Sequence, residues 1–309
     1  MDISSYECEN QMSLFGDKVF RITNHVRLIE LFGGIGAQAA ALRNIGADFE
    51  HYRMCEIDKF AVKSYNAIHG TNFTPTDIKE LAGKDLGIEK TDKYTYIMTY
   101  SFPCVDLSRA GKSLGMAKGS GTRSGLLWEV ERLLKECTEL PQVLLMENVP
   151  QVHSEKNRAD FEMWLDFLKG LGYSNFWKDL NAKEYGMAQN RNRCYVVSIL
   201  GDYTYTFPDK VPLEKDAYAY LEDDVDEKYY LKSETAQKLV DNLEQKSTIA
   251  RAEQSRAEQS RAIIDLSIVS PKARDIVNCV SARTNRGVSF RPAEGTGVYE
   301  PKKSRQEEQ

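Results

Sequence analysis

Short apolar runs alternate with amphipathic stretches through the first two-thirds of this 309-residue chain. Continuous or alternating apolar positions predict strands, and apolar positions three and four residues apart predict helices. We expect strands at residues 26–31, 49–57, 94–100, 143–146, 175–180 and 194–200. We expect helices at residues 37–44, 59–69, 126–137 and 161–171. This order predicts a parallel α/β sheet with helices on both faces and ligands at the carboxyl ends of its strands.

The alternation fades after Phe207-Pro208. Residues 251–255 are repeated directly at 256–260, and a five-residue period matches no helix face, so we predict a solvated insert there. Residues 265–298 are predicted to be rich in β-structure. The pattern therefore divides the chain into an N-terminal extension at 1–25, an α/β domain at 26–207, and a smaller region at 208–309 whose polar tail begins at 300.

Composition narrows the class of protein. Hydrophobic residues make up 41% of the chain and charged residues 28%, which suits one large domain with a smaller appendage. No apolar run approaches the roughly 20 residues that span a bilayer, and residues 1–20 lack the features of a secretory signal. We expect a cytoplasmic protein without a membrane partner. The 6 cysteines stand singly among 4 histidines, without a zinc-ligand spacing, so we predict reduced thiols and no metal.

The net charge of −5 argues weakly against a generic nucleic-acid binder, because phosphate contacts require a basic face. Charge is nevertheless uneven along the chain. Arg109, Lys112, Lys118 and Arg123 fall in one loop rich in glycine and serine, opposed only by Asp106. A local basic rim on an acidic protein stays an open alternative.

The first candidate site is the turn Phe32-Gly33-Gly34-Ile35-Gly36 between a predicted strand and a predicted helix. Glycines permit a tight turn and a close ligand, and the helix N-terminus offers unpaired N–H groups. Glu56, at the end of the next strand, can hold the hydroxyls of a ribose, and Asp77 can accept from an adenine amino group. No further glycine completes the pyrophosphate motif after Gly36, which favours S-adenosylmethionine over a dinucleotide.

A thiol and an acid follow two other predicted strands. Cys104 comes after the strand at 94–100, directly behind Pro103, and Glu147 follows the strand at 143–146. A thiol and an acid at one sheet edge can add to an electron-poor ring and protonate it. The alternatives are a buried structural thiol for Cys104, and a helix cap or ion pair for Glu147.

Two arginines precede the last predicted strand, in the run Gln189-Asn190-Arg191-Asn192-Arg193. Side chains at positions i and i+2 of an extended chain point the same way. A surface charge pair is one interpretation. Beside a thiol and an acid, anchoring of a base or a phosphate is the better hypothesis.

These motifs resemble, in the same order, those of the cytosine-5 DNA methyltransferases, over about residues 26–200. Phe102-Pro103-Cys104 is similar to the nucleophile motif, Glu147-Asn148-Val149 to the acid motif, and residues 189–193 to the double-arginine motif. The segment 122–129 is similar to the family's loop-to-helix segment. The cofactor contacts that the resemblance implies are Phe32, Gly33, Gly34, Ile35, Gly36, Glu56, Ile57, Asp77, Ile78, Pro103 and Leu126.

The resemblance implies a Rossmann-like S-adenosylmethionine-dependent methyltransferase sheet at 26–207 and a target-recognition region at 208–309. It implies a bacterial or phage restriction–modification enzyme that acts on double-stranded DNA. The target cytosine would be flipped out of the duplex, and Cys104 would then attack C6. Glu147 would hydrogen-bond N3 and the exocyclic amine, and C5 would take the methyl group. Arg193 would hold the base or the catalytic loop, with Arg191 in support.

The chain departs from the family pattern at two places. Val105 follows the cysteine, where the family most often has Gln or Asn. The family's closing Gly-Asn-Ser/Ala-Val segment is not found, and residues 290–294 are at best a faint version of the motif that precedes it. A truncated chain, a second polypeptide that supplies the segment, or a divergent segment would explain this. An RNA cytosine-5 methyltransferase and a subunit that only binds cofactor or DNA stay open, whereas the glycine spacing disfavours an NAD-dependent oxidoreductase.

Overall fold

The computed structural model describes residues 18–107 and 114–222, the single positions 226, 234, 238 and 241, and the strand backbones at 262–265, 277–278 and 296–299. Two compact units are present. The first comprises Met1–Asp179 and Arg193–Pro208, and the second comprises Leu180–Asn192 and Asp209–Gln309. Several predicted features lie outside the described residues: Arg109, Lys112, the repeat at 251–260, the segment at 290–294 and the tail from 300.

A six-stranded sheet forms the centre of the first unit, in the order β2-β1-β3-β4-β7-β5. All the predicted strands are present, with small differences at their ends. β1 pairs in parallel with β2 and with β3, and β3 pairs in parallel with β4. The strands are β1 (His25–Leu31), β2 (Phe49–Cys55), β3 (Tyr94–Tyr100), β4 (Val143–Asn148), β5 (Tyr173–Asn181) and β7 (Asn192–Leu200).

The sheet is mixed, so the prediction of an entirely parallel sheet is wrong at β7. This strand runs antiparallel to β4, with Tyr195 opposite Glu147 and Cys194 opposite Asn148. An apolar run does not reveal its direction, because buried strands of either direction are apolar. The antiparallel direction brings the start of β7 to the edge of the sheet where β4 ends, and so places Arg193 next to the predicted acid.

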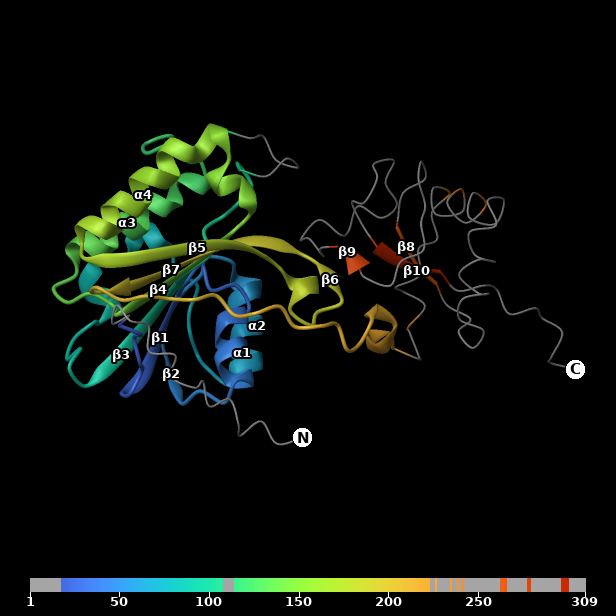
Figure 1. The fold of residues 1–309 in the computed structure, drawn as a ribbon, viewed down its shortest axis with the longest axis horizontal. Coiled ribbons are helices and arrows are strands. Elements are labelled where there is room, and N and C mark those ends of the chain that lie inside the picture. The colour runs from blue at the N-terminus through green and yellow to red at the C-terminus, as the bar shows by residue number, and fades with distance from the viewer. Residues whose placement is uncertain are drawn as a thin grey trace, which may run out of the picture. The chain divides into compact units, whose positions relative to one another are not determined.

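Helices cover both faces of the sheet, as predicted, with α1 and α2 on one face and α3 and α4 on the other (Figure 1). The alternation of side chains along β1 agrees. Leu28 packs with Ala39 of the first helix, whereas Ile29 belongs to the main core with Leu133 and Trp164. The helices are α1 (Ala37–Asn44), α2 (Lys59–His69), α3 (Leu127–Glu136) and α4 (Arg158–Gly170).

Short 3₁₀ helices complete the connections of the first unit. The predicted helix at 126–137 begins as one of them, η3, before α3. They are η1 (Ile78–Glu80), η2 (Gly83–Leu86), η3 (Ser124–Leu126), η4 (Pro150–His153) and η5 (Glu155–Asn157). From the N-terminal extension, Val19 forms a β-bridge with Thr204, and the ring of Phe20 contacts that of Tyr203.

The second unit has its own short elements. β8 pairs with β10 in antiparallel orientation, and β6 pairs in parallel with β9. Buried Ala188 and Ala217 form a small apolar cluster with Leu213, Tyr218 and Leu221. The elements are η6 (Ala182–Glu184), β6 (Gln189–Asn190), η7 (Ala217–Tyr220), β8 (Ala262–Asp265), β9 (Val277–Asn278) and β10 (Thr296–Tyr299). No helix among the described residues of either unit has the length and apolar character needed to cross a membrane.

Candidate active site

The glycine-rich turn follows β1 and requires left-handed backbone. Phe32 has a φ of 57°, Gly34 of 55° and Gly36 of 81°. A Cβ atom on Gly36 would lie 2.3 Å from Nε2 of His69 and 2.7 Å from the ring of Tyr65. Position 36 therefore excludes a side chain both by its conformation and by its lack of space.

Replacing Gly36 by alanine should lower the free energy of unfolding by at least about 2 kcal/mol, measured by urea denaturation. Gly46 supplies a matched control, because its φ is 72° but nothing lies within 4 Å of an added Cβ. Gly46→Ala should cost only about 1 kcal/mol, the conformational part. Equal losses in the two variants would show that the close contacts with His69 and Tyr65 do not matter.

Glu56 follows β2 and faces this turn. Its Oε2 accepts from the N–H of Gly34 at 3.1 Å, and its Oε1 accepts from the N–H of Asp58 at 2.9 Å. A carboxylate has about four acceptor sites, so both oxygens can also accept from the hydroxyls of a ribose. The N–H of Thr76 donates to the carbonyl of Glu56 at 2.8 Å, which brings the neighbouring Asp77 to the same edge.

The other predicted cofactor residues of this edge differ in exposure. Ile35 and Ile57 are 56% and 66% exposed, so both offer apolar surface to a ligand. Asp77 is half-buried and its Oδ1 accepts from the N–H of Lys79 at 3.0 Å. Ile78 is buried in the core, so a ligand would have to contact it through its backbone.

A buried carboxylate that sequence analysis missed lies below the turn. Glu30 is fully buried on β1. The hydroxyl of Tyr65 donates to its Oε2 at 2.5 Å, and the N–H of Ala39 donates to its Oε1 at 3.3 Å. Burial raises the pKa of Glu30 to about 7. The sequence feature that could have revealed Glu30 is an acid inside the apolar run that ends at Leu31. An acid buried in such a run must be paired or neutral.

The raised pKa of Glu30 makes stability depend on pH. Between pH 4.5 and about 7 the unfolded chain releases the proton of Glu30 and the folded chain keeps it. Stability therefore falls as pH rises across this window, by about 1.4 kcal/mol per pH unit and about 3 kcal/mol in total. Urea denaturation from pH 5 to 8 should show this fall reduced in Glu30→Gln and unchanged in the exposed control Glu89→Gln. The same slope in all three proteins would contradict the assignment.

Cys104 is half-buried in the loop after β3. Ser124 fastens this loop from the start of the segment before α3. Its Oγ donates to the carbonyl of Pro103 at 2.7 Å, and its N–H donates to Oδ2 of Asp106 at 3.2 Å. Leu126, at the end of η3, packs against the main core. Ser124 thus holds in place Pro103, the residue that directly precedes the predicted nucleophile.

Glu147 is the penultimate residue of β4, which ends beside the Cys104 loop. Nε of Arg193 lies 3.0 Å from its Oε1, and the two side chains are 16% and 18% exposed. The amide of Asn148 donates to the carbonyl of Phe102 at 2.9 Å. Asn148 therefore connects the strand of the acid to the loop of the thiol. Acid, arginine and thiol loop are brought to one edge of the sheet.

The remaining predicted basic residues are placed differently. Arg191 belongs to the second unit, where its N–H donates to Oδ1 of Asn181 at 3.0 Å. Its catalytic role stays a prediction. In the first unit, Nζ of Lys118 pairs with Glu131 at 2.6 Å, and Arg123 is exposed. Lys118 is thus already engaged by an acid of α3.

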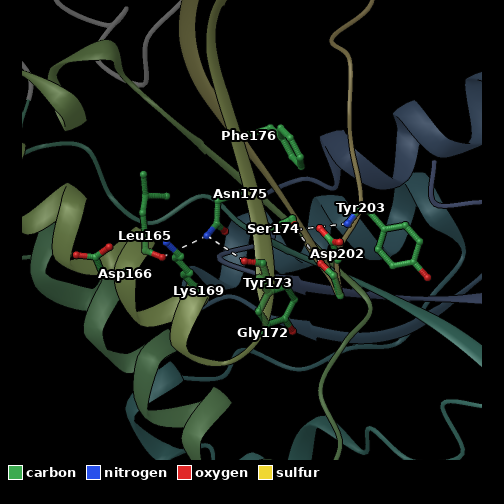
Figure 2. A pocket seen from close by; sticks show the side chains of 11 residues that line it. Leu165, Asp166, Lys169, Gly172, Tyr173, Ser174, Asn175, Phe176, Asp202 and Tyr203 are labelled. Carbon is green, nitrogen blue, oxygen red and sulfur yellow. Dashed lines mark hydrogen bonds between the residues drawn. The ribbon is translucent and has the colours of Figure 1, made fainter. Parts of the chain in front are cut away.

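A pocket of the first unit lies at the opposite edge of the sheet (Figure 2). It includes Ser174, Asn175 and Gly201, near the start of β5 and after the end of β7. Because Ile199 of β7 pairs with Val143 at the start of β4, this pocket is far along the strands from Glu147. The Oγ of Ser174 donates to the carbonyl of Gly201 at 2.7 Å. The pocket does not coincide with the thiol and acid.

Comparison with known proteins gives a family and a fold. A model of the family described as C-5 cytosine-specific DNA methylase matches residues 26–306. The chain is 32% identical over 256 residues to the type II methyltransferase M2.ScrFI of Lactococcus lactis subsp. cremoris, covering 67% of this chain and 71% of that protein. It is 33% identical over 240 residues to the orphan methyltransferase M.SssI of Spiroplasma monobiae, covering 60% and 62%. The chain thus spans less than two-thirds of the length of the second relative.

Solved structures support the fold. The S. pombe Dnmt2 methyltransferase has a TM-score of 0.55 at 22% identity, over 71% of this chain and 67% of that chain. The Entamoeba histolytica methyltransferase EhMeth has a TM-score of 0.57 at 20% identity, over 70% and 65%. Both share the α/β methyltransferase architecture predicted from the sequence.

Proposed function

The chain belongs to the C-5 cytosine-specific DNA methylase family, and from this premise we propose that it transfers a methyl group from S-adenosylmethionine to C5 of cytosine in double-stranded DNA. The observation that carries the proposal is the Glu147–Arg193 pair, 3.0 Å apart at the edge of the sheet that also holds the Cys104 loop. Residues of this kind at one edge suit addition to a pyrimidine ring. The named relatives give no support to a second polypeptide as a partner.

The residues after β1 and β2 fit the cofactor. Glu56 keeps acceptor sites for ribose hydroxyls beside the N–H of Gly34. The exposed side chains of Ile35 and Ile57 offer apolar surface on which an adenine ring can lie. Asp77 and the backbone of Ile78 would complete the adenine contacts. When bound, S-adenosylmethionine supplies the electrophilic methyl group that C5 takes up.

The protein side chains would prepare the base for this transfer. The cytosine would leave the duplex, which costs a few kcal/mol. The Cys104 thiolate would donate its electron pair to C6, forming a C–S bond and making C5 electron-rich. Glu147 would hydrogen-bond N3 and the exocyclic amine, and Arg193 would orient Glu147 and the base. After methylation, C5 would lose its proton to a base from solvent, and the C–S bond would break to release the Cys104 thiolate.

The second unit would carry target recognition. We include in it the segment 180–192 as well as residues 209–309, because both lie in one compact unit. Base-edge contacts specify a DNA site, and phosphate contacts position the protein. Arg193 would act at the base, with Arg191 in support.

The purified chain, incubated with methyl-tritiated S-adenosylmethionine and mixed-sequence duplex DNA, tests the proposal. Digestion to nucleosides should place the label in 5-methylcytosine. A duplex RNA of the same sequence serves as the matched substrate, and we expect no label in it. Label found only in RNA would show that the substrate is RNA and not DNA. Measurable binding of S-adenosylmethionine without transfer to DNA would contradict the proposed activity.

A further inference from the structure

Three side chains of different chemistry meet next to the predicted catalytic edge. They are His153 at the end of η4, Asp179 on β5 and Cys194 on β7. Their imidazole nitrogen, carboxylate oxygen and thiol sulfur all lie within 4.8 Å of one another. We propose that His153, Asp179 and Cys194 form a binding site for a divalent transition-metal ion, with zinc as the best fit.

The donor set selects the class of metal. Zinc is bound by nitrogen, sulfur and oxygen together, whereas calcium and magnesium prefer ligand sets made of oxygen. Bonds of about 2.0–2.3 Å in a tetrahedral site place neighbouring donor atoms roughly 3.3–3.8 Å apart. Nε2 of His153 already lies 3.0 Å and 3.1 Å from the two carboxylate oxygens of Asp179. The imidazole and the carboxylate are thus already close to the separation that a shared ion requires, and the thiol lies within 4.8 Å of both.

The fold holds these donors in place before any ion binds. Asp179 and Cys194 lie on β5 and β7, which are neighbours in the sheet. The imidazole of His153 lies against the ring of Trp177, with the centroids 4.7 Å apart, and 6.0 Å from that of Phe161. Aromatic contacts on the imidazole limit its rotation. The three donors thus start from rigid elements, as a preformed site requires.

The partial exposure of two of the three ligands gives the ion a path into the site and leaves its fourth coordination position open to solvent. Cys194 is fully buried, whereas the side chains of His153 and Asp179 are 25% and 32% exposed. The ion would enter from the side of these two residues and would keep a water molecule as its fourth ligand. On binding, the Cys194 thiol would release its proton to solvent, and each donor atom would contribute an electron pair. The charge of the ion would be largely neutralised by one thiolate and one carboxylate.

The ion would have a structural role and would stabilise the edge of the sheet that holds the predicted catalytic residues. Cys194 directly follows Arg193 and lies opposite Asn148, the residue after Glu147. An ion bound here would join η4, which follows β4, to β5 and to the start of β7, and so limit movement of the Glu147–Arg193 pair. The competing interpretation is a hydrogen-bonded His153–Asp179 pair beside a thiol that has no ligand role.

Cobalt(II) titration of the metal-free protein distinguishes the two interpretations without reference to methyl transfer. A near-ultraviolet thiolate-to-cobalt charge-transfer band should appear with one equivalent of cobalt. The band should persist in Cys104→Ser and be lost in Cys194→Ser. A band that is absent from the wild-type protein, or that disappears in Cys104→Ser instead, would overturn the proposal.

A second variant protects the test against loss of folding in Cys194→Ser. His153 is partly exposed, so His153→Gln should fold, and it should bind cobalt at least about tenfold more weakly. Zinc should raise the melting temperature of the wild-type protein and of Cys104→Ser, and should raise that of His153→Gln much less. Equal zinc effects in all three proteins would show that His153 is not a ligand and would refute the site.

Discussion

Replacing Cys104 by serine should lower the rate of methyl transfer to DNA by at least about 10³-fold. The nucleophile in the proposed reaction is a thiolate, and a serine hydroxyl is not ionised at neutral pH. The loop around position 104 is fastened by backbone groups, including the N–H of Leu107, which donates to the carbonyl of Cys104 at 3.1 Å. The substitution should therefore leave the fold and the binding of S-adenosylmethionine intact.

Initial rates with tritiated S-adenosylmethionine measure this effect, and Cys137→Ser provides a matched control. Cys137 is a half-buried thiol directly after α3, whose Sγ lies 3.7 Å from the carbonyl of Gly83. Its replacement should change the rate by less than about twofold, since it lies outside the proposed site. A Cys104→Ser rate within tenfold of the wild type would eliminate Cys104 as the nucleophile.

Covalent trapping provides a second readout for the same variant. Duplex DNA that carries 5-fluorocytosine cannot lose its C5 substituent as a proton, so the C–S bond formed at C6 should persist. The wild-type protein should form a DNA adduct that survives denaturing electrophoresis in the presence of S-adenosylmethionine. An adduct of equal yield with Cys104→Ser would show that another residue attacks the base.

Replacing Glu147 by glutamine should lower the rate of methyl transfer by about 10²–10⁴-fold. The side-chain carbonyl of glutamine can still accept from Nε of Arg193, which lies 3.0 Å from the present carboxylate. The position of Arg193 should therefore be preserved while the acid is lost. The expected defect lies in the chemistry on the base, so the turnover rate should fall much more than the affinity for DNA.

Glu50→Gln is the matched control for loss of an ion pair. Glu50 accepts from Nε of Arg27 at 3.1 Å, between β1 and β2 and apart from the proposed site. This variant should retain the wild-type rate, because half-exposed ion pairs contribute little to stability. If Glu147→Gln has the same rate as Glu50→Gln, Glu147 contributes only a structural ion pair. This is the alternative interpretation that the sequence also allowed.

The local sequence pattern was sufficient to predict the helices and strands. It was also sufficient to predict at which strand ends the candidate functional residues lie. The helix predicted at 59–69 is found with the same bounds, because Asp58 caps its first N–H groups and Gly70 ends it with a φ of 66°. Strand periodicity placed the glycine-rich turn and Cys104 after predicted strands, Glu56 at the end of the strand predicted at 49–57, and Glu147 directly after the strand predicted at 143–146. In the structure β4 extends to Asn148 and includes Glu147. Parallel pairing of β1, β2, β3 and β4 then collects these ends at one edge.

Tertiary structure alone decided which of these residues meet. The direction of β7 brings Arg193 to Glu147, and an apolar run carries no information on direction. Residues 180–192 join the second unit through contacts with distant segments, such as the pairing of β6 with β9. Glu30 becomes a buried acid only when helices cover β1.

The cluster of His153, Asp179 and Cys194 likewise could not be predicted from the sequence. Its members lie on three elements that are separate in the sequence, so no motif spacing joins them. The sequence by itself determined secondary structure, motif order and family membership, because these depend on residues that are close along the chain. Pairing, burial and the assembly of side chains from separate elements depend on long-range packing, which only the folded structure supplies.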